Sequence, residues 1–589
     1  MSSPEQRRAT PEDDGSGVPE SQNPAVPQKL PAAALQNLPS AAAQASAPVE
    51  MVHDVHDGFA PLKIPLFRDR WIASTVSNLG TWMQDTAGTW LMTALTSSPL
   101  LIALMLTAAS LPVLLFGLLA GATADIFDRR RLLIFWQIWM LVSVGLLAVF
   151  TLFGIITPWT LLILTFLLNV GSAMNNPAWQ AIVPELVPRE QIPNAVTLNS
   201  ISNNLARALG PALGGLLVAA FTRTDNGAGW VFFLNAVSFA GVIWVLVNWR
   251  SKPLFKSALP AERIAGSIRS GLRYVRYAPG LQASLVHAFV FPFFVSSVWS
   301  LLAVVAKRDL NQGAMGYGIL NGCLGLGAIG GATLLPRVRR HLSSDGIIIA
   351  ASFVYSGAML VLGLVHVPWI VMAVLVLGGF SWTSTMATLN ASVQLSVPAW
   401  VQARALGTYL MIFQGGLASG SALWGAIAEH SSTTVAFLCA TAGFVIVTPF
   451  TMRFHVLRGA APDLSPYQYK RPLPTLAVTP DPEDGPVRIS VEYNVPLDKY
   501  EEFTHCIHAL RAVRMRGGAM RWGIYRDAEN PEKLEETFVV ESWLDYLRSR
   551  ERMTEADSAI RARAYALNRG PELPKVMHQI YAKEASDNG

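Results

Sequence analysis

Charged side chains are scarce in this sequence. Of its 589 residues, 14% are Asp, Glu, Lys or Arg, whereas soluble domains carry roughly 25%. Hydrophobic residues make up 51% of the chain and include 17 Trp and 26 Phe, more than a water-soluble surface of this size would hide. This composition excludes a single ordinary soluble globule and favours a polytopic membrane protein.

Cysteine is also rare. Cys323, Cys439 and Cys506 lie far apart and form neither a CxxC pair nor a plausible disulfide framework. No spacing of His, Cys, Asp or Glu is typical of a metal site, so we expect neither a metal nor a cofactor.

The charge that is present is unevenly distributed. Residues 71–249 contain 12 charged residues in 179, whereas residues 486–585 contain 32 in 100. A helix needs about 20 apolar residues to cross the hydrocarbon core of a bilayer, and the uncharged runs are long enough for twelve such helices. We place the spans near 71–95, 100–124, 132–156, 159–180, 196–221, 229–249, 281–306, 315–336, 346–366, 368–394, 404–428 and 432–454.

Basic residues in the short loops predict the orientation of these spans. The connections from even to odd spans carry most of the Lys and Arg, as in 129–131 and 250–276, and only Arg223, Lys307 and Arg308 fall on the other side. Because basic loops stay inside, both termini are expected in the cytoplasm. The expected segments are a disordered tail at 1–62, six-helix halves at 63–249 and 281–456, a central loop at 250–280, a Pro-rich linker at 457–486 and a soluble domain at 487–583.

An internal repeat relates the two halves. A shift of 210 residues without a gap places Pro158-Trp159 on Pro368-Trp369, Gly210 on Gly420 and Gly215 on Gly425. Two parallel six-helix repeats that face each other across a central site are typical of rocker-type secondary transporters. The predicted fold class is therefore an all-α polytopic membrane protein with an α+β ferredoxin-like domain at its C-terminal end.

The loop after the second span carries a recognisable motif. Gly121, Asp125, Asp128, Arg129 and Arg130 resemble the signature loop of the major facilitator superfamily, which usually has Gly where Asp128 stands. In water Asp125 would pair with Arg129 or Arg130, whereas the resemblance implies that it is a latch between helices that gates the conformational change.

The fifth span carries a second motif. Gly210, Pro211, Gly214 and Gly215 resemble the motif of drug and proton antiporters in that superfamily. These small residues form a smooth face for close helix packing, and the same face can slide or hinge during alternating access. Near Trp82-Met83-Gln84 the opening spans resemble the transmembrane secretion effector branch, which includes the enterobactin exporter.

Two charges are predicted at membrane depth. Asp85 lies about 14 residues into the first span and Arg207 about 11 into the fifth, so both reach similar depths. A charge there costs at least about 2.5 kcal/mol on insertion scales, so each needs a partner or a function. One hypothesis is a static Asp85–Arg207 bridge. The other is that Asp85 exchanges protons or that Arg207 attracts an anionic solute.

Uncharged amides and aromatic residues are candidates for a solute cavity. Amides and indoles suit a large, partly aromatic solute, although the same residues can join helices by hydrogen bonds. The candidates are Asn175, Asn176, Asn203, Trp382 and Asn390.

The C-terminal segment has the pattern of a soluble βαββαβ domain. Strands are expected at 487–495, 520–525, 537–541 and 576–581, with helices over 497–513 and 543–567. The stretch from Ser542 to Arg548 resembles the antibiotic biosynthesis monooxygenase-like dimeric α/β barrel, which implies a homodimer through this domain. No catalytic residue is predicted, and equal numbers of acidic and basic residues give nucleic-acid binding no support.

These features together predict a secondary active transporter in the inner (plasma) membrane. Its expected partners are the lipid bilayer, protons and a small organic solute such as a siderophore, drug or secondary metabolite, which it would export by proton antiport. Two alternatives stay open. The transporter is fused to an active cofactor-free monooxygenase-type enzyme, or the same fold imports a lipid or solute.

Overall fold

The computed structural model describes residues 59–182, 186–188, 191–249, 264–456, 462–467, 480–569 and 573–582. Nearly all of the expected N-terminal tail therefore lies outside the described residues, as do 250–263 of the central loop and most of the Pro-rich linker.

Twelve helices of at least 19 residues form the first part of the chain, and each overlaps one of the predicted spans. Ten of them are long and apolar enough to cross a membrane, whereas α3 and α8, which carry Asp85 and Arg207, fall short of that hydropathy. Proline or a capping side chain begins most of these helices. The helices are α3 (Pro65–Leu95), α4 (Pro99–Ile126), α5 (Arg129–Leu152), α6 (Pro158–Ala181), α8 (Ile192–Ala219), α9 (Thr224–Asn248), α11 (Pro279–Val304), α12 (Ala314–Val338), α13 (Ser344–Leu364), α14 (Pro368–Leu395), α15 (Ala399–His430) and α16 (Thr433–Thr451).

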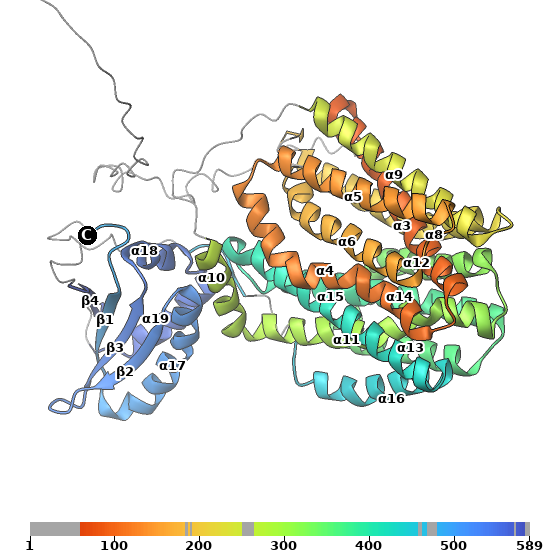
Figure 1. Cartoon of the computed structure of the whole chain (residues 1–589). Helices are drawn as coiled ribbons and strands as arrows, with labels where there is room; N and C mark the ends of the chain where they lie inside the picture. Colours follow the sequence, from red (N-terminus) through yellow and green to blue (C-terminus); the bar gives the residue numbers. More distant parts are fainter. Residues whose placement is uncertain are drawn as a thin grey trace, which may run out of the picture. The chain divides into compact units, whose positions relative to one another are not determined.

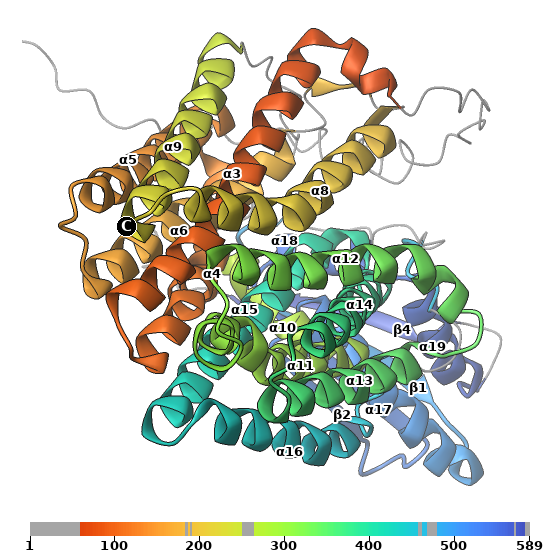
Figure 2. The same cartoon turned by 90° about the vertical axis from the view of Figure 1, so that its right-hand side faces the viewer.

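The packing of these helices repeats, which confirms the predicted two-repeat architecture. In the first half α3 packs on α8, α4 on α6 and α5 on α9; in the second half their counterparts pair in the same way, α11 with α15, α12 with α14 and α13 with α16. In Figure 2 most of the helices of residues 65–248 lie above those of residues 279–451. The two halves meet chiefly through α4 with α15 and through α8 with α12.

The C-terminal part is the expected ferredoxin-like unit. Its strands are β1 (Val487–Asn494), β2 (Arg521–Arg526), β3 (Lys533–Val540) and β4 (Lys575–Ile580), and they form an antiparallel sheet in the order β2-β3-β1-β4. Helices α17 (Tyr500–Gly517), α18 (Trp543–Glu551) and α19 (Glu555–Ala566) lie on one side of the sheet (Figure 1).

Two predictions for this unit were wrong in detail. The third strand begins at Lys533, because Asn494 to Val487 on β1 pair with the whole of 533–540. The single helix expected over 543–567 is two helices, α18 and α19. Thr554 begins the second one with a capping box, in which its side chain and that of Asp557 bond each other's backbone N–H groups.

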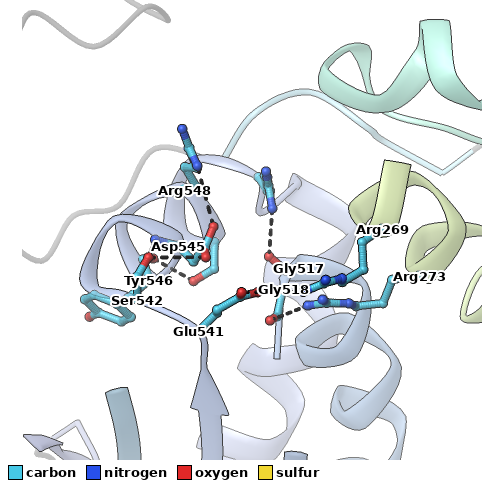
Figure 3. Close-up of polar contacts among 11 residues, drawn as sticks. Arg269, Arg273, Gly517, Gly518, Glu541, Ser542, Asp545, Tyr546 and Arg548 are labelled. Carbon is cyan, nitrogen blue, oxygen red and sulfur yellow. Dashed lines mark hydrogen bonds and ion pairs between the residues drawn. The ribbon is translucent and has the colours of Figure 1, made fainter. Parts of the chain in front are cut away.

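Part of the expected central loop is also helical. Helix α10 (Ile264–Arg276) has apolar residues at helical spacing on one face and arginines on the other. Arg273 donates a hydrogen bond of 2.6 Å to the Gly518 carbonyl, which follows the C-terminal end of α17, and Arg269 pairs with Glu541 at 3.3 Å (Figure 3). Burial raises the pKa of Tyr274 on the same helix to about 12, so its hydroxyl stays protonated.

A buried carboxylate organises the core of the sheet. Glu536 on β3 is fully buried and accepts both guanidinium hydrogen bonds of Arg514, at 3.0 and 3.1 Å. The Tyr493 hydroxyl and the Trp522 indole also donate to it, at 3.2 and 3.0 Å. Burial lowers the pKa of Arg514, but the Glu536 carboxylate raises it more, so the net shift is upward. The four donors satisfy the buried charge.

Removing this charge should destabilise the sheet. Glu536→Gln leaves Arg514 buried without its counter-ion, which costs about 3–5 kcal/mol. Glu492→Gln on the neighbouring strand removes a part-exposed pair with Lys533 and should cost about 1 kcal/mol or less. Hydrogen exchange of the β1 and β3 amides in the full chain measures both, and equal protection in the two variants would contradict the assigned role of Glu536.

Candidate functional site

The site lies where the two halves of the bundle approach each other. On α8, a Cβ added at Gly215 would lie 2.6 Å from the Ala314 carbonyl oxygen and 3.0 Å from the Gly318 Cα of α12. Its repeat counterpart, Gly425 on α15, faces Ala103 of α4 in the same way, with 2.5 Å between the added Cβ and the Ala103 Cβ. Glycine thus permits backbone contact at both symmetry-related crossings between the halves.

A pocket lies beside the α8–α12 crossing. In this conformation its free volume is about 10 Å³, which is room for about one water molecule. Both halves contribute to its wall, and three indole rings dominate it. The lining residues are Trp82, Arg207 and Pro211 from the first half and Trp299, Asn321, Leu324, Gly325, Ala328, Gly379 and Trp382 from the second.

Arg207 is the cation in this wall. Its guanidinium carbon lies 5.4 Å from the centre of the Trp82 ring, within the range of a cation–π contact. The Nε atom is buried and finds no hydrogen-bond partner among the described residues. A buried donor without a partner is costly, so the pocket offers an unsatisfied positive group to an acceptor on a solute.

Asp85 lies one helical turn from Trp82 on α3, and its side chain is exposed. The described residues contain no ion pair between Asp85 and Arg207, so the static bridge is not formed in this conformation. Asp85 instead lies near the Tyr317 hydroxyl of α12. The carboxylate therefore faces the other half of the bundle.

The predicted amides are not part of this pocket's wall. Among the predicted cavity residues only Trp382 lines it, whereas Asn203 accepts a 2.9 Å bond from Asn78, and Asn176 and Asn390 accept bonds from Gln180 and Gln394. Asn175 is buried, and its side-chain oxygen has no partner among the described residues. Asn321 was not predicted, because apolar residues occur on every face of α12.

The signature loop after α4 is anchored within the first half. Asp128 caps α5 by accepting a 2.8 Å bond from the Arg131 backbone N–H, and Arg130 donates to the carbonyls of Leu246 and Val247 at the C-terminal end of α9. A cation suits that negative helix end. The side chain of Asp125 lies outside the described part, so its proposed gating contact stays a prediction.

The glycines of the fifth-span motif have two different neighbours. Gly210 and Gly214 pack on α3 within their own half; a Cβ at Gly214 would lie 2.7 Å from the Met83 carbonyl oxygen. Gly215 instead contacts the opposite half. Pro211 is buried in α8, and its carbonyl oxygen would lie 2.8 Å from a Cβ at Gly318. The motif therefore joins packing inside one half to contact between the halves.

A family profile and several curated proteins match this chain. The profile is described as transmembrane secretion effector, and its match covers residues 56–586, which include the C-terminal sheet. The MFS-type transporter YfiS of Bacillus subtilis, itself uncharacterized, is 31% identical over 42% of this chain and 59% of its own length. The staphyloferrin A transporter of Staphylococcus aureus is 22% identical over 63% of this chain and 93% of its own. The enterobactin exporter of Shigella boydii is 23% identical over 65% and 90%.

Solved structures share the fold of the helical bundle. A mutant of the nucleoside transporter NupG superposes with a TM-score of 0.56 at 10% identity, over 66% of this chain and 99% of that one. A D-xylose-proton symporter gives 0.54 at 11% identity, over 66% and 97%. At these identities the likeness concerns the fold alone.

A larger side chain at Gly215 should separate the halves. Valine there would press into the α12 backbone, and such overpacking costs about 1–3 kcal/mol. We expect the thermal transition of detergent-solubilised Gly215→Val to fall by several degrees. Gly241→Val is the matched control, since nothing lies within 4 Å of a Cβ at that position on α9. Equal stability of the two variants would contradict the close crossing.

Proposed function

The chain belongs to the transmembrane secretion effector family of the major facilitator superfamily, and from this premise we propose that it exports a small organic molecule by proton antiport. The observation that carries this proposal is the pocket between the halves, with Arg207 and three tryptophans in its wall. A site at the repeat interface can be opened to either side when one half rocks against the other.

The chemistry of the wall favours an anionic solute with a flat aromatic part. Indole rings supply stacking surface, and Arg207 supplies a cation whose Nε has no hydrogen-bond partner among the described residues. The two siderophore-named relatives, one called a transporter and the other an exporter, support the export of an iron-chelating metabolite or a compound of similar chemistry.

Proton coupling is assigned to Asp85. An ionisable group within a span is a functional candidate by default, and this carboxylate has no ion pair among the described residues. Protonation would remove its charge as the halves close around it. Solute and proton would then bind at neighbouring positions and exchange in turn.

The orientation follows from the basic loops. Arg129–Arg131 and the arginines of α10 lie on one side of the bundle in the predicted topology, which is therefore the cytoplasmic side. The bundle would lie in the inner membrane of a bacterial-type cell, with both termini and the C-terminal sheet on its cytoplasmic side.

We assign the C-terminal unit an accessory role in dimerisation or in the delivery of solute. The family match extends across it, and the Arg273–Gly518 bond ties it to α10 (Figure 3). The resemblance of 542–548 to monooxygenase-like dimeric barrels supports pairing of two copies through this unit.

Removing the cation of the pocket should weaken solute binding. A hydrogen bond to a charged group contributes about 1.5–3 kcal/mol, so Arg207→Gln should lower the affinity for anionic aromatic solutes by about 10- to 100-fold. Arg223→Gln is the control, because Arg223 pairs with Asp225 outside the pocket. Counterflow in vesicles across a panel of siderophores and drugs measures this, and an unchanged affinity for every transported anion would refute the role of Arg207.

Removing the carboxylate should uncouple the transporter. Asp85→Asn should abolish solute movement driven by a pH gradient while leaving solute exchange in counterflow largely intact, because exchange requires no net proton movement. The control is Asp225→Asn, which changes an acid outside the pocket. Gradient-driven export that persists in Asp85→Asn would assign the coupling elsewhere.

A further inference from the structure

Two cations on the less basic side of the bundle need a structural reason. Lys307 and Arg308 lie on a π-helical turn (Val305–Asp309) that continues α11, on the side where positive loops are disfavoured. Turns of this kind occur frequently at functional sites. The Asp309 carboxylate accepts a 3.3 Å bond from Thr433 of α16, which ties the turn to the second half of the bundle.

Both cations reach across to the first half. The Lys307 ammonium donates to the Thr93 carbonyl, and the Arg308 guanidinium donates to the Ser97 carbonyl. Thr93 lies in the last turn of α3, and Ser97 lies two residues beyond its end. The last carbonyls of a helix lack intrahelical partners and carry partial negative charge, so the cations lie where the α3 dipole favours them.

A carboxylate contacts the positive, N-terminal end of the next helix, α4. Glu429, at the end of α15 in the second half, accepts 2.8 Å from the Ser98 hydroxyl and 3.3 Å from the Leu100 backbone N–H. Ser98 is the N-cap of α4. The first N–H groups of a helix carry partial positive charge, so this carboxylate also matches the helix end that it contacts.

These bonds close one end of the bundle. Nearby, the Thr107 and Ser421 hydroxyls lie 2.7 Å apart, and Trp90 stacks on Tyr317 with ring centres 5.7 Å apart; both contacts cross between the halves. Towards the opposite end of the same two helices, nothing lies within 4 Å of a Cβ at Gly121 on α4 or at Gly407 on α15. The halves are therefore joined at the α3–α4 loop, whereas there is open space beside Gly121 and Gly407.

We propose that Lys307, Arg308 and Glu429 form a gate, the loop latch, that holds this end closed by pairing charges with the facing ends of α3 and α4. All four hydrogen bonds join one half to the other, so they must break whenever the halves separate at this end. When these bonds break, the three charged side chains become hydrated by water. The α3–α4 loop that they leave contains no charged residue. The latch can thus open without leaving an unpaired buried ion.

The test measures how often this end is closed. In a full-length chain with Cys323, Cys439 and Cys506 replaced by Ser, Thr107→Cys and Ser421→Cys place two thiols across the closed end. The rate of their cross-linking in membrane vesicles reports the closed population. The cross-linking measurement requires no solute and no proton gradient, so its result is independent of the proposed transport activity.

Loss of the latch should slow this cross-linking. Since hydrogen bonds to charged groups stabilise by more than neutral ones but are weakened by exposure to water, we expect about a three- to tenfold lower rate in Lys307→Gln/Arg308→Gln and in Glu429→Ala. The control is Arg223→Gln, which removes a cation on the same predicted side that pairs within the first half; its rate should equal that of the parent.

The two latch variants protect the test from misfolding. If the double variant fails to reach the membrane, Glu429→Ala still tests the two hydrogen bonds that Glu429 accepts from the start of α4. An unchanged rate in the variants that fold would overturn the proposal. So would an equal loss in Arg223→Gln, because the effect would then come from the charge of that side in general.

Discussion

The two halves of the bundle approach each other at crossings where only glycine or alanine lies between the backbones. Gly215 against Gly318 and Gly425 against Ala103 set these distances, and the repeat makes the two crossings equivalent. The pocket lies beside the close approach of α8 and α12, which extends from Gly215 to Arg207, because a Cβ at Gly325 would lie 3.3 Å from the Arg207 carbonyl oxygen. The contacts of the α3–α4 loop with Lys307, Arg308 and Glu429 depend on the same approach. A rocking motion about these crossings would change the pocket and the closed end together.

Charge within and near the bundle is placed with a recurring logic. Arg130 binds the carbonyls that end α9, the two cations of the π-turn bind those that end α3, and Glu429 binds the amides that begin α4. Each of these charges compensates a helix end, where backbone groups lack partners. Asp85 and Arg207 differ, because neither pairs with an opposite charge in the described chain. That difference separates charges that hold helix ends from the two to which we assign solute and proton binding.

In the C-terminal unit, too, a buried charge is compensated by hydrogen-bond donors. Its one fully buried carboxylate, Glu536, has four donors, and the remaining charges lie largely on its surface. The contact of Arg273 with the end of α17 again matches a cation to helix-end carbonyls. The family match extends across this unit, and α10 contacts both α17 of this unit and α15 of the bundle.

The sequence by itself determined the twelve helices, the two repeats and the order of the C-terminal strands. These follow from long uncharged runs, from Gly, Pro and Trp held in one register, and from alternation in β1, all of which are local or periodic signals. It also singled out Asp85 and Arg207, since charge inside an apolar run is conspicuous. The tertiary structure alone decided that the two do not pair, that Trp82 and Asn321 share a pocket, and that Glu429 caps α4. Such contacts join residues more than 100 positions apart, and in helices with apolar residues on every face, periodicity does not tell which side meets a neighbour.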